Sequence, residues 1–206
     1  MEILGKIFGS EARARVLRLF FFSPDISFEI KDIAKKTKTG LKVVRKELAL
    51  LHTVGIIKRN NFYIDIPGKK SRKLSRKKIA GWCLDKTFNY GEQLKNLLIS
   101  MDLTTKSNIT NRFKNAGKVK LVVISGIFIK DEASRLDILI VGDKLKRGSI
   151  ERILHSLEAE VGKELRYSVL DTPEFLYRMD IYDRFVRDIL DYPHEVVIDK
   201  LGFKLA

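Results

Sequence analysis

The sequence predicts a mixed α+β protein made of two parts. Within the first 90 residues, apolar residues recur with helical spacing in three short segments, and two segments rich in β-branched and aromatic residues follow them. In the second part, strongly apolar strand-like segments alternate with amphipathic helical ones, which favours helices packed on a mixed sheet. We therefore expect domains at residues 1–90 and 118–206, joined by a helical connector over residues 91–117.

The positive charge of the chain lies almost entirely in the first part. The 206 residues carry a formal net charge of +14, with 40 Lys or Arg and 26 Asp or Glu. Residues 1–90 hold 21 of these cations and 8 of the anions, whereas residues 91–206 hold 19 and 18. This asymmetry predicts a polyanion-binding domain attached to an electrically balanced one. A basic surface that only confers solubility is the alternative.

The composition excludes several classes of protein. Hydrophobic residues make up 45% of the chain, which is enough for a packed core and too much for a wholly disordered chain. Cys83 is the single cysteine, so neither an intramolecular disulfide nor a cysteine-only metal site can form. No apolar run approaches the ~20 residues that cross a bilayer, and the N-terminus lacks a signal-peptide core. We therefore expect a soluble, cytoplasmic protein that does not contact membranes.

Three helices are predicted in order along the first part. Ser10 can cap a helix that starts at Glu11, and the stretch Ser23-Pro24-Asp25 ends it. A short second helix follows Ser27, and a third begins near Leu41 and ends at Gly55. The positions expected to face inward are Ala12, Val16, Leu19 and Phe20 in the first helix, Ile30, Ile33 and Ala34 in the second, and Leu41, Val44, Leu48 and Leu51 in the third.

The second and third helices, joined by a short turn over residues 37–40, have the layout of a helix-turn-helix. In that layout the second helix of the pair enters the major groove of DNA, with its N-terminal half against the base edges. The residues expected to contact DNA are Lys38, Thr39, Lys42, Val43, Arg45 and Lys46. An ordinary three-helix bundle with a solvated basic face fits the same spacing.

A strand, a basic loop and a second strand follow the third helix. Residues 56–66 and 79–84 are strand-like, and seven of the ten residues between them, over 69–78, are Lys or Arg. Such a hairpin is expected to act as a β-wing that neutralises DNA phosphates through Lys69, Lys70, Arg72, Lys73, Arg76, Lys77 and Lys78. A flexible charged loop or a localisation signal are the alternatives. We expect Trp82, Phe62 and Tyr63 to pack the wing against the helices.

The first part resembles the small winged-helix regulators of the ArsR-like type. The resemblance covers about residues 5–90 and rests on residues 8–20, on Ile30 with Ile33-Ala34, and on residues 44–48 with Leu51 and 55–57. It implies a winged helix-turn-helix domain that binds duplex DNA. The cysteine pairs of the metal-sensing members are absent, so metal sensing is not expected. Because one winged helix contacts only a few base pairs, we expect a homodimer.

The second part is predicted as an α/β domain with a mixed sheet. Helices are expected over residues 90–101, 108–116, 150–161 and 183–190, with a further helix capped by Thr172 that opens with Pro173. Strands are expected over residues 119–128, 134–141, 165–170 and 195–198.

This part resembles a minimal nucleotidyltransferase domain over about residues 115–203, on the strength of residues 121–126, 136–143, 172–175, Phe185 and 189–190. Active members of that fold carry Gly-Ser after the first strand and Asp-x-Asp at the second, where two carboxylates bind Mg²⁺. Here the corresponding positions are Gly126-Ile127 and Arg135-Leu136-Asp137. The resemblance therefore implies a domain without catalysis, in which Asp137 forms an ion pair with Arg135. Carboxylates that could replace the missing one are Asp131, Glu132, Asp143 and Asp171.

The function predicted from these features is a DNA-binding transcriptional regulator. Its second domain would serve dimerisation, a protein partner or a small ligand, and the chain would not be an enzyme. No cofactor and no metal are expected, since His52, His155 and His194 lack metal-ligand spacing. Two alternatives are an active nucleotidyltransferase delivered by the winged helix, and a component of a toxin–antitoxin pair.

Overall fold

The computed structural model describes residues 3–67, 74–100, 106–129, 131 and 133–202. It has the predicted mixed α+β character, with a two-stranded and a four-stranded sheet. The chain divides into two compact units. One contains the described residues up to Ser100 together with Glu158–Lys163, and the other contains the remaining described residues. Among the described residues, no helix is both long and apolar enough to cross a bilayer.

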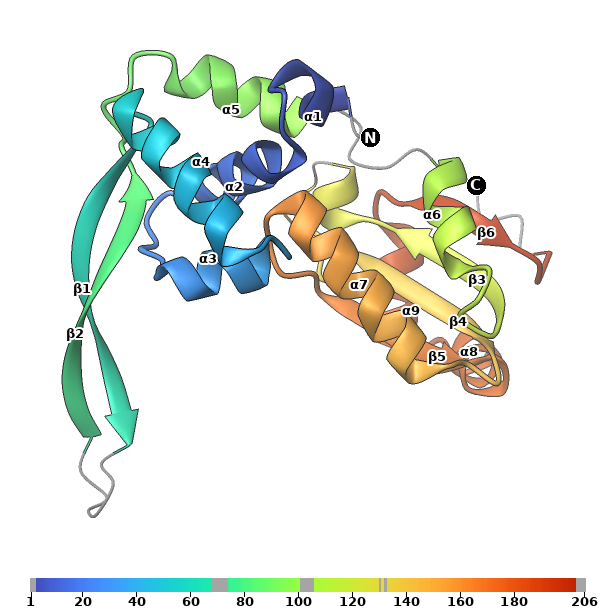
Figure 1. Cartoon of the computed structure of the whole chain (residues 1–206). Coiled ribbons are helices and arrows are strands. Elements are labelled where there is room, and N and C mark those ends of the chain that lie inside the picture. Colours follow the sequence, from blue (N-terminus) through green and yellow to red (C-terminus); the bar gives the residue numbers. More distant parts are fainter. Residues whose placement is uncertain (1–2, 68–73, 101–105, 130, 132, 203–206) are drawn as a thin grey trace. The chain divides into compact units, whose positions relative to one another are not determined.

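The first unit consists of four helices, one long hairpin and a fifth helix after it, among the described residues up to Ser100 (Figure 1). The elements are α1 (Ile3–Ile7), α2 (Glu11–Phe22), α3 (Ile30–Lys36), α4 (Leu41–Thr53), β1 (Ile57–Pro67), β2 (Leu74–Leu84) and α5 (Gly91–Ser100). The predicted cap of α2 is confirmed, because the Ser10 hydroxyl accepts the Arg13 N–H at 3.2 Å.

The core of this unit forms where the inner faces of α2, α3 and α4 meet. Its buried side chains include Phe20 of α2, Ile33 of α3, and Val44 and Leu48 of α4, as the spacing predicted. Leu41 was expected there as well, but its side chain is 41% exposed. That prediction is wrong because Leu41 occupies the first turn of α4, and the core contacts of this helix begin one turn later, at Val44.

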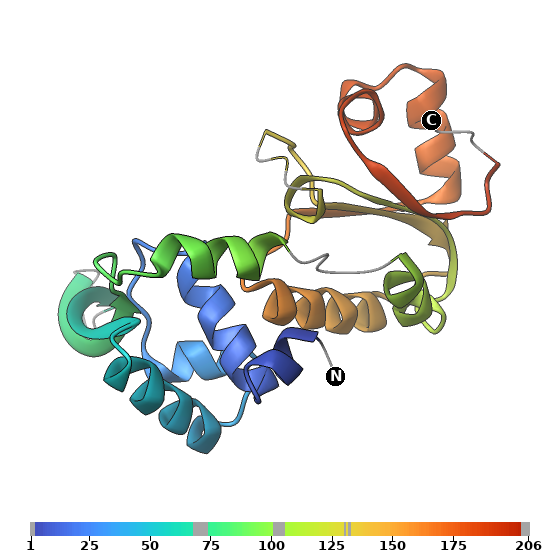
Figure 2. The same cartoon turned by 90° about the horizontal axis from the view of Figure 1, so that it is seen from above.

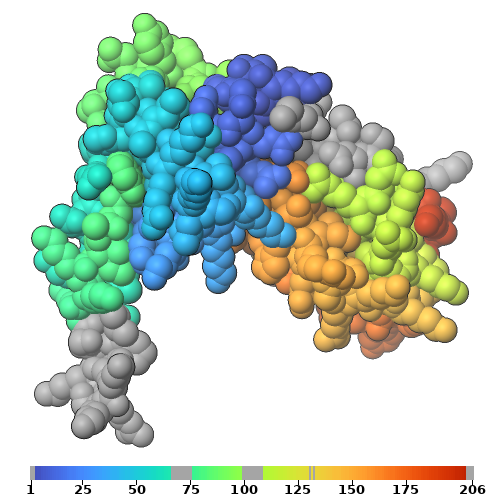
Figure 3. Space-filling view, in the orientation of Figure 1, coloured from blue at the N-terminus to red at the C-terminus, as the bar shows by residue number. Residues whose placement is uncertain are grey.

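The hairpin is longer than the sequence suggested. Strands β1 and β2 pair antiparallel from Ile57 opposite Leu84 to Pro67 opposite Leu74. They twist around each other (Figure 1) and extend away from the helices of the same unit (Figure 3). Arg76, Lys77 and Lys78 were expected in a loop, and this is wrong: they lie within β2, because cross-strand pairing continues past the apolar stretch.

The second unit is built on a four-stranded mixed sheet in the order β5-β4-β3-β6. Its β4–β5 pair is parallel, and the β3–β4 and β3–β6 pairs are antiparallel. The elements are α6 (Lys106–Phe113), β3 (Lys118–Ile124), the 3₁₀ turn η1 (Gly126–Phe128), β4 (Ile138–Asp143), α7 (Arg147–Val161), β5 (Tyr167–Asp171), α8 (Thr172–Asp180), α9 (Arg184–Asp191) and β6 (Glu195–Asp199).

Helices cover both faces of this sheet, so its central strands are apolar on both sides (Figure 2). Val122 and Ile140 face the layer of α6 and α7, whereas Leu121, Val123 and Val141 face α8 and α9.

Several element boundaries of the second unit differ from the predicted ones, and three of the differences have a bearing on the motif residues or on helix capping. Strand β3 ends at Ile124 rather than at residue 128, because the chain turns at Gly126, where φ is +57°. Strand β4 begins at Ile138 rather than at residue 134. The N-cap of α8 is Asp171, and Thr172, predicted as the cap, is a buried residue of the first turn.

Candidate nucleic-acid interface

The rotation of α4 about its axis is set by apolar packing and by one buried carboxylate. Glu47 is 4% exposed, and its two carboxylate oxygens accept hydrogen bonds from the Ser10 hydroxyl and from Arg13 Nε, both at 2.8 Å. These bonds connect α4 to the start of α2. Together with Val44 and Leu48 they hold one side of α4 against the core, so the other side must face solvent.

The solvent-facing side of α4 carries the predicted DNA contacts. Lys42, Val43, Arg45 and Lys46 are all exposed. Among the residues that the structure describes, no carboxylate lies within ion-pair distance of these three cations. Their charges therefore remain available to an anionic partner, and Val43 adds an apolar side chain between them.

The turn before α4 contains the two other residues predicted to contact DNA. Lys38 is exposed and has a left-handed backbone, with φ at +49°. Thr39 is half-buried, and its hydroxyl donates to the Thr37 carbonyl at 3.1 Å. The single proton of the Thr39 hydroxyl is thus used within the turn, and its oxygen can only accept a hydrogen bond from another partner.

The pairing register divides the basic residues of the hairpin between its two faces. Residues directly opposite each other share a face, and faces alternate along each strand. Lys78 and Arg76 therefore lie on the face that also holds Arg59 and Trp82, whereas Lys77 lies on the other face, opposite Ile64. The described cations of the predicted wing therefore do not all share one face of the hairpin.

Arg76 also has a partner within the hairpin. It lies opposite Asp65, and the Arg76 Nε to Asp65 Oδ1 distance is 3.7 Å, with both side chains mostly exposed. An exposed pair of this kind is weak, so it lowers the net charge of this position without holding the arginine in place. Lys69, Lys70, Arg72 and Lys73, the other predicted wing contacts, lie outside the described residues.

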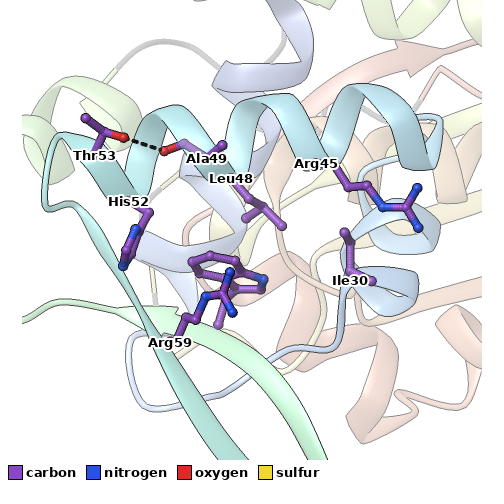
Figure 4. Close-up of a pocket in the computed structure, with 8 residues that line it drawn as sticks. Ile30, Arg45, Leu48, Ala49, His52, Thr53 and Arg59 are labelled. Carbon is purple, nitrogen blue, oxygen red and sulfur yellow. Dashed lines mark hydrogen bonds between the residues drawn. The ribbon is translucent and has the colours of Figure 1, made fainter.

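A pocket of about 440 Å³ lies between α4 and the base of the hairpin. In Figure 4, Arg45 and His52 project from α4, and Arg59 extends from the hairpin toward that helix. Sequence reasoning missed Arg59 and assigned no role in binding to His52. The described residues that line the pocket are Ile30, Arg45, Leu48, Ala49, His52, Thr53, Arg59 and Trp82.

Arg59 and His52 both contact the single tryptophan of the chain. The guanidinium carbon of Arg59 is 5.1 Å from the centroid of the Trp82 ring. The His52 ring meets Trp82 edge-on at a centroid distance of 5.4 Å. Trp82 itself packs against the core, as predicted, and Phe62 is half-buried. Tyr63 is 63% exposed and does not pack against the helices, so that part of the prediction is wrong.

The second unit brings together Gly126, Ile127 and Asp137, three of the four residues that the sequence resemblance singled out, but not Arg135. The Ile127 N–H donates to Asp137 Oδ1 at 3.0 Å, and the Gly126 backbone lies directly against this carboxylate. The predicted Arg135–Asp137 ion pair is wrong. Asp137 pairs with Arg166 at 3.3 Å, and Arg135 pairs with Asp188 at 2.8 Å, because Arg166 at the start of β5 lies beside the buried end of β4.

Within the described residues, no group of three or more His, Cys, Asp and Glu side chains is arranged to hold a metal ion. The other carboxylates named as replacements serve local roles. Asp143 pairs with Lys120 at 2.8 Å, and this hydrogen-bonded ion pair lowers the pKa of Asp143 below its ordinary value. Asp131 accepts the Ala133 N–H, Asp171 occupies the N-cap position of α8 without a capping hydrogen bond from its side chain, and Glu132 lies outside the described residues.

Comparison of the chain with protein-family models, with curated proteins and with solved structures finds no match in any of the three.

Proposed function

We propose that this protein binds duplex DNA through the exposed side of α4 and the adjoining face of the β1–β2 hairpin, as a transcriptional regulator. The observation that carries the proposal is that Arg45 of α4 and Arg59 of β1 line one pocket, with no acidic residue among its described lining residues. Cations from the helix and from the hairpin thus border the same space. This layout is typical of a winged helix, in which one helix enters the major groove and the wing contacts the backbone.

Electrostatics supplies most of the binding in this proposal. Each phosphate that a Lys or Arg neutralises releases condensed counterions, so the logarithm of the binding constant should fall linearly with the logarithm of salt concentration. Lys42, Arg45 and Lys46 contribute charges that no described carboxylate neutralises. Val43 would contact base edges, where an apolar side chain can meet a thymine methyl group.

The second unit, in this proposal, is a nucleotidyltransferase-like domain that has lost catalysis and serves dimerisation or the binding of a protein or small ligand. The support is the environment of Asp137. Its side chain is buried, and each carboxylate oxygen already accepts hydrogen bonds from Arg166 or from the Ile127 N–H. A dimer would place two copies of α4 on two half-sites, and its sequence specificity would exceed that of a single copy on one half-site.

A binding titration with matched charge variants tests the proposal. The triple variant K42A/R45A/K46A should bind mixed-sequence duplex DNA at least about tenfold more weakly than the wild type. Its slope of log K against log salt should be shallower by about 2 to 3, since each phosphate contact contributes about 0.9. Fluorescence anisotropy at several salt concentrations measures both quantities.

The matched control is K144A/K146A/R147A, which removes three exposed cations from the second unit. It should change the affinity less than twofold. Equal losses in the two triple variants would show that only net charge matters and would contradict the assignment to α4. Transfer of a nucleotide from Mg²⁺-ATP to protein or RNA, abolished by D137A, would contradict the non-catalytic second unit.

A further inference from the structure

The pocket between α4 and the hairpin has the chemistry of a phosphate site. We infer that it binds one phosphate group, that Arg59 is its principal donor, and that Trp82 positions Arg59. The inference rests on the proposed function for the source of that phosphate, which is the backbone of bound DNA.

The first argument is the way in which Arg59 is held. Its guanidinium lies over the Trp82 ring, 5.1 Å from the centroid, so a cation–π contact orients it by one face. A stacked guanidinium still presents its N–H donors along its edges, in the plane where a phosphate oxygen accepts them. No described carboxylate lies within ion-pair distance of Arg59. Within the described part of the chain, the guanidinium of Arg59 is thus held against Trp82 without a carboxylate partner.

The second argument is that the supporting ring is itself held in place. Trp82 exchanges two backbone hydrogen bonds with Phe28, at 2.9 and 3.0 Å, and its side chain packs against the core. His52 of α4 contacts the ring edge-on. Little conformational entropy remains to be lost when Arg59 meets an anion, which favours tight binding relative to a freely moving lysine.

The third argument is the charge of the walls. Arg45 lines the pocket from α4 and Arg59 lines it from β1, so two different elements each contribute an arginine to its walls. The Thr53 hydroxyl, which also lines the pocket, donates its proton to the Ala49 carbonyl at 3.0 Å. It therefore has no proton left to donate to an anion. The cationic donors available to an anion are therefore the two arginines, with the His52 ring beside them.

Lys58 offers a matched control for Arg59. It is the preceding residue on the same strand and has the same charge, but it lies on the opposite face, beside Cys83, and pairs with Asp85 at 3.3 Å. R59Q and K58Q therefore remove one charge each at adjacent positions of β1. Only R59Q removes a donor from the pocket.

The experiment measures duplex binding by R59Q, K58Q, W82L and W82F at several salt concentrations. R59Q should weaken binding about tenfold and reduce the salt slope by about 1, as loss of one phosphate contact requires. K58Q should change the affinity less than twofold. W82L should weaken binding severalfold and W82F should recover most of the loss, because Phe keeps an aromatic face for the guanidinium. Thermal melting of each variant identifies any that fails to fold.

A backbone scan identifies the phosphate. Each duplex in a set carries one neutral methylphosphonate in place of a phosphate, at a different position in each duplex. At one position the substitution should weaken binding by the wild type but should not weaken binding by R59Q any further. Such non-additivity is the signature of direct contact. Equal effects of R59Q and K58Q, with no coupled position, would overturn the phosphate site while leaving duplex binding in place.

Titration with a free anion tests the phosphate site independently of the proposed DNA binding. Trp82 is the single tryptophan of the sequence, so its emission reports on the pocket alone. Inorganic pyrophosphate should change that emission in the wild type and in K58Q but not in R59Q. If the wild type shows this response yet fails to bind duplex DNA, the phosphate source is a free anion and the proposed function is wrong. If neither ligand produces a response, both proposals fail.

Discussion

Arg166 donates its backbone N–H to Asp137 Oδ2 at 2.8 Å, and its Nε and Nη2 lie 3.3 Å from Oδ2 and Oδ1 of the same carboxylate. The Asp137 side chain is almost fully buried, whereas Arg166 is half-exposed. A carboxylate surrounded in this way joins the start of β4 to the start of β5 and to the turn at Ile127. Its role in this geometry is structural.

Replacing Asp137 should therefore lower stability more than replacing Arg135. D137A leaves the Ile127 and Arg166 N–H groups without an acceptor, and we expect a loss of about 2 to 4 kcal/mol in the free energy of unfolding. R135A breaks an ion pair whose arginine is mostly exposed, so about 1 kcal/mol or less is expected. Urea denaturation of both variants measures the difference. A larger loss for R135A would contradict the assigned partners.

Gly126 should be less tolerant of alanine than Gly55, although both have positive φ, at +57° and +84°. A Cβ on Gly126 would lie 2.1 Å from Asp137 Oδ1, whereas a Cβ on Gly55 would meet nothing within 4 Å. G55A should cost about 1 to 2 kcal/mol, the usual penalty for this backbone region. G126A should cost clearly more, since the buried carboxylate must also move. Similar unfolding midpoint shifts in the two variants would refute the close contact.

The hairpin base should lose stability in acid through Asp85. The Thr87 hydroxyl and N–H donate to its carboxylate and, with Lys58 beside it, lower the pKa of Asp85 below its ordinary value. A lowered folded-state pKa stabilises the protein fully above the unfolded Asp pKa of about 3.9, and this contribution disappears as the pH falls through the lower folded-state value.

Melting temperatures of the wild type and D85N should therefore differ near neutral pH and converge as the solution becomes more acidic than pH 4 or so. D180N is the control, because Asp180 is an exposed residue at the end of α8 and its substitution should leave the melting curve unchanged. A difference between wild type and D85N that stays constant down to the lowest pH would show that the carboxylate charge is not involved.

Val43 should affect sequence preference rather than general affinity. It is 44% exposed on the cationic side of α4. V43A should weaken binding to the preferred site about fivefold, the loss expected for one or two buried methyl groups, and leave binding to unrelated DNA unchanged. Binding to the preferred site with each thymine replaced in turn by uracil, which lacks the methyl group, measures the contact. Equal losses on all sequences would assign Val43 to packing instead.

Local spacing alone was enough to predict most of the helices and strands. The three helices around Phe20, Ile33 and Leu48, the Ser10 cap, and the apolar strands of the second unit follow from periodicity and capping, which act over a few residues. The position of the exposed basic residues on α4 also follows, because the apolar stripe of a helix determines which side chains point away from the core.

Only the tertiary structure determined which residues from distant parts of the sequence contact each other. The face that Lys78 shares with Arg59 depends on the register of the hairpin, and a shift of one residue would reverse it. Asp137 pairs with Arg166, which is 29 residues away in the sequence, and not with the nearby Arg135. The reason is that strand pairing brings the starts of β4 and β5 together. The stacking of Arg59 on Trp82 likewise joins two strands. Such contacts depend on how distant segments pair, which local sequence patterns do not encode.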